Sequence, residues 1–183
     1  MRLIIIIILI NFGTFASLAD DIRITFNKES SKYWGYISDR TMGGISNGQA
    51  FLDVDKDIMF ARLTGNVSTK NNGGFIQLRS TLSFLNINNV EKKIKGVRLN
   101  TKGNGETYHI FIRTSETRSY SDFYYATFIA NDEWKIVDLP FSEFKHRFSN
   151  SLLDGNDIQT FGIVAYGREF YSDVSVSEII FYF

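Results

Sequence analysis

Short segments in which apolar and polar positions alternate run through the chain from residue 22 to its end. In residues 107–114, for example, Tyr108, Ile110 and Ile112 occupy alternate positions. A two-residue period is typical of a β-strand with one buried face, and no segment keeps a helical period over three turns. The pattern predicts about ten strands: residues 22–26, 49–54, 58–63, 75–79, 94–101, 107–114, 120–129, 134–139, 158–166 and 174–183.

The connections between these segments carry turn chemistry. Asn47-Gly48 is a strong hairpin signal, because both residues tolerate the positive φ angles of a tight turn. Residues 102–106 contain two glycines between clear strands and predict a second hairpin. In the last strand the apolar phase slips between Val176 and Ile179, which indicates a β-bulge. Short strands joined by turns at regular spacing predict an all-β sandwich of one domain.

The N-terminus departs from the strand pattern. Arg2 gives a positive start, an unbroken aliphatic run follows, and a small-x-small sequence ends at Ala19 before two acidic residues. These three features make up a secretory signal peptide with cleavage expected after Ala19, and retention as an anchor is the alternative. We therefore expect a signal peptide of residues 1–19 and a domain of residues 20–183, exported to the periplasm or secreted.

Charge and cysteine content narrow the function classes. The chain has 20 Lys and Arg against 20 Asp and Glu, and loss of residues 1–19 leaves a formal charge of −1. A nucleic-acid-binding domain normally has a basic excess, so we expect no nucleic-acid partner. The chain has no cysteine, which excludes thiol catalysis, cysteine metal sites and disulfides.

Two glycine-rich stretches, residues 38–48 and 71–75, place glycine pairs among short polar side chains. Glycine admits positive φ and close backbone approach, and Asn, Asp and Ser stabilise turns through local hydrogen bonds. If both stretches meet at one end of the sandwich, they surround a concave backbone patch and are candidate binding loops. Turn formation alone is the competing explanation. The candidate residues are Trp34, Asp39, Arg40, Met42, Gly43, Gly44, Ser46, Asn71, Asn72, Gly73 and Gly74.

Several motifs occur in a fixed order along the chain. Trp34 precedes SDRTMGGIS at residues 38–46, and NNGGF follows at residues 71–75. Further on come a glycine-rich segment at residues 94–108 and the W-x-x-V-x-L-P-F-x-x-F pattern at residues 134–144. This order resembles the signatures of the complex I intermediate-associated protein 30 family, and the resemblance covers nearly all of the expected mature domain.

The resemblance implies a galactose-binding-domain-like jelly-roll β-sandwich, in agreement with the strand pattern. It also implies a non-enzymatic role, because the family takes its name from assembly chaperones of respiratory complex I. The first hypothesis is therefore an envelope binding module that acts through protein–protein interaction, with a membrane or envelope complex as partner. Asn104 and Lys145 depart from the Asp and Pro of the family, and both lie in predicted turns.

Motifs for catalysis and metal binding are missing. Asp53, Asp55 and Asp57 have the spacing of calcium ligands, but the required glycine and glutamate that follow are absent, so a charged hairpin tip is the better interpretation. His109 and His146 lie in separate segments without a neighbouring ligand pattern. No nucleophile elbow or dinucleotide fingerprint is present. We expect no catalytic residue, no metal and no cofactor.

Aromatic residues support a second hypothesis, a carbohydrate-binding module. Sugar rings offer C–H faces to aromatic side chains and hydroxyl groups to nearby amides and charges. Residues 120–125 and 170–171 contain consecutive aromatics, so at least one ring in each points away from the core of an extended segment. Core packing is the competing explanation for most aromatic side chains. The candidate platform is Tyr120, Tyr124, Tyr125 and Tyr171.

Overall fold

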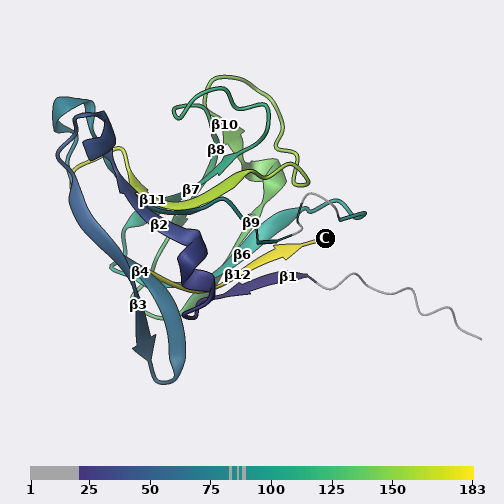
Figure 1. The fold of residues 1–183 in the computed structure, drawn as a ribbon, viewed down its shortest axis with the longest axis horizontal. Helices are drawn as coiled ribbons and strands as arrows, with labels where there is room; N and C mark the ends of the chain where they lie inside the picture. The colour runs from purple at the N-terminus through teal and green to yellow at the C-terminus, as the bar shows by residue number, and fades with distance from the viewer. Residues whose placement is uncertain (1–20, 83, 86, 88–89) are drawn as a thin grey trace, which may run out of the picture.

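The computed structural model describes residues 21–82, 84–85, 87 and 90–183 and consists of two antiparallel β-sheets that pack face to face (Figure 1). The expected signal peptide lies outside the described residues. Sheet A has the strand order β3-β4-β12-β6-β9, with β1 also paired to β12. Sheet B has the order β10-β8-β7-β11-β5-β2. The all-β sandwich predicted from the alternation is confirmed.

The strands of sheet A are β1 (Ile22–Thr25), β3 (Asn47–Asp55), β4 (Ile58–Val67), β6 (Gly96–Gly103), β9 (Lys135–Pro140) and β12 (Phe170–Tyr182). Those of sheet B are β2 (Trp34–Ser38), β5 (Phe75–Ser80), β7 (Thr107–Arg113), β8 (Tyr124–Ile129), β10 (Lys145–His146) and β11 (Thr160–Tyr166). Short 3₁₀ helices are η1 (Ser30–Tyr33), η2 (Asp39–Met42), η3 (Lys70–Asn72) and η5 (Phe141–Glu143). None of the helices in the described part of the chain is long and apolar enough to cross a membrane.

The core lies between the sheets, where the inward positions of facing strands meet. Tyr108, Ile110 and Ile112 on β7 are fully buried there, as the alternation predicts. Phe161 on β11 packs against Phe181 on β12 at 5.6 Å between ring centroids and so joins the two sheets. The register shift of β12 between Val176 and Glu178 confirms the predicted bulge, which turns both halves of the strand toward the core.

The hairpin predicted at Asn47-Gly48 is wrong. Both residues lie inside β3, and Gly48 stands opposite Gly65 of β4. β3 and β4 form a hairpin whose turn lies at Lys56 and Asp57, which adopt φ angles of 46° and 72°. The turn geometry is therefore supplied by a charged pair, whereas Gly48 is needed where two backbones come close: a Cβ there would overlap a carbonyl oxygen of β4.

The hairpin predicted at residues 102–106 is also wrong. β6 belongs to sheet A and β7 to sheet B, so these residues carry the chain from one sheet to the other. Gly105 takes the positive φ of 81° in this crossing, and its N–H donates to the Ala130 carbonyl at 2.8 Å. Local turn chemistry is the same in a hairpin and in a crossing, so only the pairing partners of β6 and β7 distinguish them.

Candidate binding groove

The two glycine-rich stretches meet at the carboxylate of Asp39, the first residue of η2. Asp39 is fully buried. Its Oδ1 accepts the Ser46 N–H at 2.9 Å, and its Oδ2 accepts the Gly74 N–H at 2.6 Å and the Phe75 N–H at 3.2 Å. The Ser46 hydroxyl also donates to Oδ2. One side chain therefore ties residues 38–46 to residues 71–75.

The glycines around Asp39 leave room for its side chain. A Cβ at Gly44 or Gly73 would overlap the Asp39 carboxylate. Burial raises the pKa of Asp39, but the hydrogen bonds from Ser46, Gly74 and Phe75 outweigh it and hold the pKa below that of an ordinary aspartate. The carboxylate is therefore ionised at neutral pH and acts as a buried acceptor.

Other candidate loop residues also shape or hold the backbone. Asn71 and Asn72 have φ angles of 56° and 57°, which asparagine tolerates better than most residues. Gly43 ends η2 in the left-handed region with a φ of 88°. The Arg40 Nε donates to the Ser46 carbonyl at 3.1 Å. Trp34 points inward and packs on the core. These backbone conformations and contacts have a structural role in or beside the loops.

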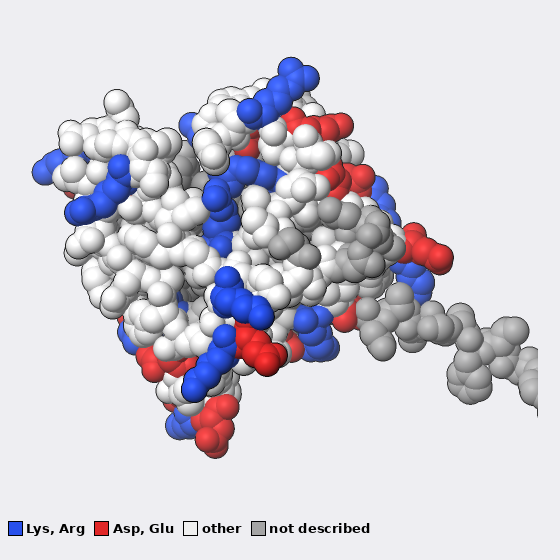
Figure 2. Space-filling model, in the orientation of Figure 1, with Lys and Arg blue, Asp and Glu red and all other residues white. Residues whose placement is uncertain are grey.

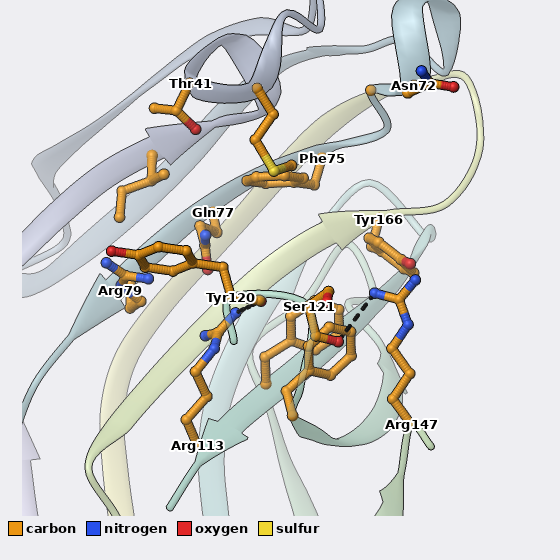
Figure 3. Close-up of a pocket in the computed structure, with 15 residues that line it drawn as sticks. Thr41, Asn72, Phe75, Gln77, Arg79, Arg113, Tyr120, Ser121, Arg147 and Tyr166 are labelled. Carbon is orange, nitrogen blue, oxygen red and sulfur yellow. Dashed lines mark hydrogen bonds between the residues drawn. The ribbon is translucent and has the colours of Figure 1, made fainter. Parts of the chain in front are cut away.

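The loops form one wall of a groove of about 590 Å³ over the outer face of sheet B (Figure 3). Three candidate loop residues, Met42, Asn72 and Gly73, line it, and so does Tyr120 from the candidate platform. The opposite wall comes from the segments that flank β8 and β10 and includes Ser121 and Arg147. In the space-filling view the surface is hollowed between two lobes, and Lys and Arg side chains gather in that hollow (Figure 2).

The four candidate platform tyrosines lie in different parts of the fold. Tyr120 is 79% exposed at the groove, and Tyr125 is half-buried on the outer face of sheet B. Tyr124 is buried in the main core, and Tyr171 is 55% exposed on β12 of sheet A. The four tyrosines therefore do not form one surface.

The floor of the groove is set by the register of three strands in sheet B. Gly162 on β11 stands between Arg79 on β5 and Phe111 on β7. Because Gly162 has no side chain, the floor is low at this central position. The adjacent Gln77 lines the groove, and its Oε1 would lie 3.2 Å from a Cβ at position 162. The Gln77 amide therefore borders the space that a side chain at position 162 would fill.

Aromatic rings cover the neighbouring part of the floor. Phe111 and Phe123 stack with their centroids 3.9 Å apart, and Tyr166 packs edge-on to Phe111 at 5.1 Å. Arg147 lies over the ring of Phe123 with its guanidinium carbon 5.2 Å from the centroid. This second apolar cluster lies on the outer face of sheet B, apart from the core between the sheets.

Polar atoms without partners also line the groove. Gln77 is only 4% exposed, and its Oε1 has no hydrogen-bond partner among the described residues. The Nε and Nη1 of Arg113 are buried and equally unpartnered within the described part of the chain, while its Nη2 donates to the Tyr120 carbonyl at 2.6 Å. Burial, reinforced by the nearby Arg79, lowers the pKa of Arg113 to about 10. Buried polar atoms normally find partners, so these unpartnered atoms are an exception that calls for an explanation.

The groove combines an aromatic floor with an amide and guanidinium groups, and the described residues that line it include no Asp, Glu or His. Across residues 21–82, 84–85, 87 and 90–183, no three His, Cys, Asp or Glu side chains are placed to hold a metal ion. An apolar floor with a few oriented polar groups is the composition of a ligand-binding site. The lining residues supply contacts for recognition.

A comparison with protein families agrees with the order of motifs in the sequence. The profile of the family described as Complex I intermediate-associated protein 30 (CIA30) matches residues 24–173. The chain belongs to this family. The CIA30 match includes both glycine-rich stretches and most of the groove. No curated protein matches the chain.

Several of the solved structures similar to this CIA30 chain are carbohydrate-binding modules. The family 11 module of the cellulase Lic26A-Cel5E of Clostridium thermocellum has a TM-score of 0.69 at 14% identity, covering 90% of this chain and 95% of that chain. The family 11 module from the same organism in complex with a β-1,3-1,4-mixed-linked tetrasaccharide has a TM-score of 0.66 at 15% identity, covering 87% and 95%. A family 30 module has a TM-score of 0.51 at 15% identity, covering 74% and 75%. These matches establish the galactose-binding-like jelly-roll fold.

Sequence reasoning missed the groove residues contributed by the strands of sheet B. Phe111 and Arg113 follow directly from the alternation that turns Tyr108, Ile110 and Ile112 inward, because every second residue of β7 must face outward. Large apolar and cationic side chains on an outer face were therefore a readable signal. Their approach to Arg79 and Arg147 depends on the order of strands in the sheet. That order cannot be derived from local patterns.

Proposed function

We propose that the protein is a non-catalytic carbohydrate-binding module that holds a glycan in the groove of sheet B. The observation that carries this proposal is the aromatic floor beside unpartnered polar atoms. Tyr120 and Tyr166 offer ring surface to the C–H faces of a sugar, next to Phe111 and Phe123, which are 5% and 4% exposed. The Gln77 Oε1 would accept from a hydroxyl group and Arg113 would donate to one. The jelly-roll fold shared with carbohydrate-binding modules supports the same function.

Binding to a panel of soluble polysaccharides, measured by affinity electrophoresis and calorimetry, tests the proposal. Tyr120→Ala and Tyr166→Ala should each weaken binding by about tenfold or more, because each removes ring surface from the groove. Tyr171→Ala is the matched control, since Tyr171 is exposed on sheet A and does not line the groove. Equal losses in all three variants, or binding to no glycan, would refute the assignment.

A second candidate function is protein binding in an assembly role, which the description of the CIA30 family favours. Met42 and Ile45 on the first glycine-rich loop are exposed apolar side chains that suit a protein contact. The variants above separate the two functions. A partner protein that binds with the same affinity to Tyr120→Ala and Tyr166→Ala, with no glycan bound, would favour the assembly role.

Export belongs to the same proposal. The charged start, apolar run and small-x-small site of residues 1–19 support a periplasmic or secreted protein, where polysaccharides are accessible. We expect the protein in the exported fraction with Asp20 as its first residue, as read by intact mass. Recovery of the uncleaved chain in the cytoplasm would contradict this placement.

A further inference from the structure

The cationic side chains of the groove lack carboxylate partners. Arg79, Arg113 and Arg147 line it, and no Asp or Glu does so in the part of the chain that the structure describes. In Figure 2 the blue side chains gather in the hollow between the two lobes. Four arginines elsewhere on the described surface each pair with a carboxylate, in the pairs Arg23–Glu178, Arg62–Asp173, Arg98–Asp138 and Arg168–Glu106. The three arginines of the groove therefore form no ion pair with a described carboxylate.

The guanidinium groups keep free donors. Arg113 uses Nη2 on the Tyr120 carbonyl, while its Nε and Nη1 have no partner among the described residues. Arg147 donates from Nη1 to the Ser121 carbonyl at 3.2 Å and stacks on Phe123. The Arg79 guanidinium forms no hydrogen bond or ion pair with other described residues. Planar guanidinium groups with free edges bind oxyanions through paired N–H donors.

Asp122 is the acidic group that favours the charged form of Arg113. Its Oδ2 accepts the Arg118 backbone N–H at 3.1 Å, while its Oδ1 lies 2.9 Å from the His146 Nε2 and is buried without a hydrogen-bond partner among the described residues. Arg79 acts on Arg113 in the opposite direction, as a like charge. An anion between these arginines would relieve that repulsion, and partial burial strengthens the attraction relative to water.

From this arrangement we propose that the glycan is acidic, with a carboxylate or sulfate group bound by Arg79 and Arg113 and a sugar ring on the aromatic floor. The inference rests on the proposed carbohydrate-binding function and names its substrate class. Arg147, over the Phe123 ring, contributes a further positive charge at the opposite wall. Uronate-containing and sulfated polysaccharides share this chemistry, since both carry oxyanions on sugar rings.

The test compares polygalacturonate, carrageenan and neutral mixed-linkage β-glucan as ligands at two salt concentrations. We expect the protein to bind polygalacturonate or carrageenan at least tenfold more tightly than the neutral glucan. Preference between the two acidic polymers identifies carboxylate or sulfate. Arg79→Gln combined with Arg113→Gln should weaken acidic-glycan binding by ten- to a hundredfold. Arg23→Gln combined with Arg98→Gln removes two charges away from the groove and should leave binding unchanged within twofold.

Two further variants keep the outcome interpretable. Arg113→Lys retains the charge but not the planar fork, so it should recover only part of the affinity, and thermal melts of each variant verify folding. Tyr120→Ala must also weaken binding to the acidic polymer, because simple ion exchange would not depend on an aromatic ring. Tight binding of the neutral glucan that the arginine variants leave intact would overturn the acidic ligand but keep the carbohydrate function. Binding of no polymer would overturn both.

Discussion

Asp39→Ala is expected to lower the free energy of unfolding by about 3–5 kcal/mol and the melting temperature by about 10 °C. The substitution removes a buried carboxylate that accepts the N–H groups of Ser46, Gly74 and Phe75 and the Ser46 hydroxyl. Two of these N–H groups belong to residues that are themselves buried, so they cannot turn to water for a replacement. Thermal and urea denaturation followed by circular dichroism measure the loss.

Two matched variants isolate the cause. Asp39→Asn keeps the side-chain volume but turns an amide NH₂ toward the N–H donors. Its loss of stability should therefore be nearly as large as that of Asp39→Ala. Asp53→Ala removes a partly exposed aspartate whose carboxylate lies 3.5 Å from the Arg62 Nη1, and it should cost less than about 1 kcal/mol. If Asp39→Ala melted like the parent protein and lost only ligand binding, Asp39 would instead be a direct ligand contact.

The same carboxylate gives the stability a pH dependence of known sign. Because hydrogen bonds hold the pKa of folded Asp39 below that of an ordinary aspartate, its contribution is complete above the unfolded pKa of about 4 and is lost as pH falls through the folded value. Melting temperatures measured from pH 6 downward should therefore fall less steeply in Asp39→Ala than in the parent protein.

The fold was readable from the sequence wherever local patterns determine it. Residues 107–114 and 174–183 alternate as strands, and the phase slip in the second locates its bulge correctly. The errors arose at turns. Asn47-Gly48 has the sequence of a hairpin turn but lies within β3, since the close approach of β4 requires a glycine there. The glycine at position 48 is required by the pairing of β3 with β4, and that pairing cannot be predicted from the local sequence.

The candidate site was readable only in part. The glycine-rich stretches do meet, as their turn chemistry allowed, and Met42, Asn72 and Gly73 line the groove. Asp39, by contrast, faces inward and holds the loops together. Arg79 and Arg147 come from β5 and the segment after β10, which sit on opposite sides of β7 in the sheet. Their joint presence at one groove follows from strand order alone.

The residues that build the glycine-rich loops differ from the residues that would contact a ligand in the groove. The stretches whose order resembles the CIA30 signatures include residues that build the loops, such as Gly44 and Gly73, which pack around the Asp39 carboxylate. The loops form one wall of the groove. In the acidic-glycan proposal the selecting side chains are instead Arg79 and Arg113 on the strands. Fold and family alone therefore do not determine what this groove binds.

Gly65→Ala is expected to cost about 3 kcal/mol of stability, the largest effect we expect from a single methyl group in the described chain. Gly65 on β4 has a φ of 148° and stands opposite Gly48 on β3. A Cβ would overlap the Asn47 carbonyl oxygen and the Gly48 Cα. Both are backbone atoms, so the strands must separate to admit it.

Gly35→Ala is the matched control, because a Cβ at that position meets nothing within 4 Å, and it should change stability by less than about 0.5 kcal/mol. Asn47 follows Ser46 directly, so a shift of β3 at Gly65 also displaces the hydroxyl and N–H that Asp39 accepts. Gly65→Ala should therefore weaken glycan binding as well, although Gly65 does not line the groove. A stability loss near 3 kcal/mol with unchanged binding would show that β3 moves without disturbing the Asp39 contacts.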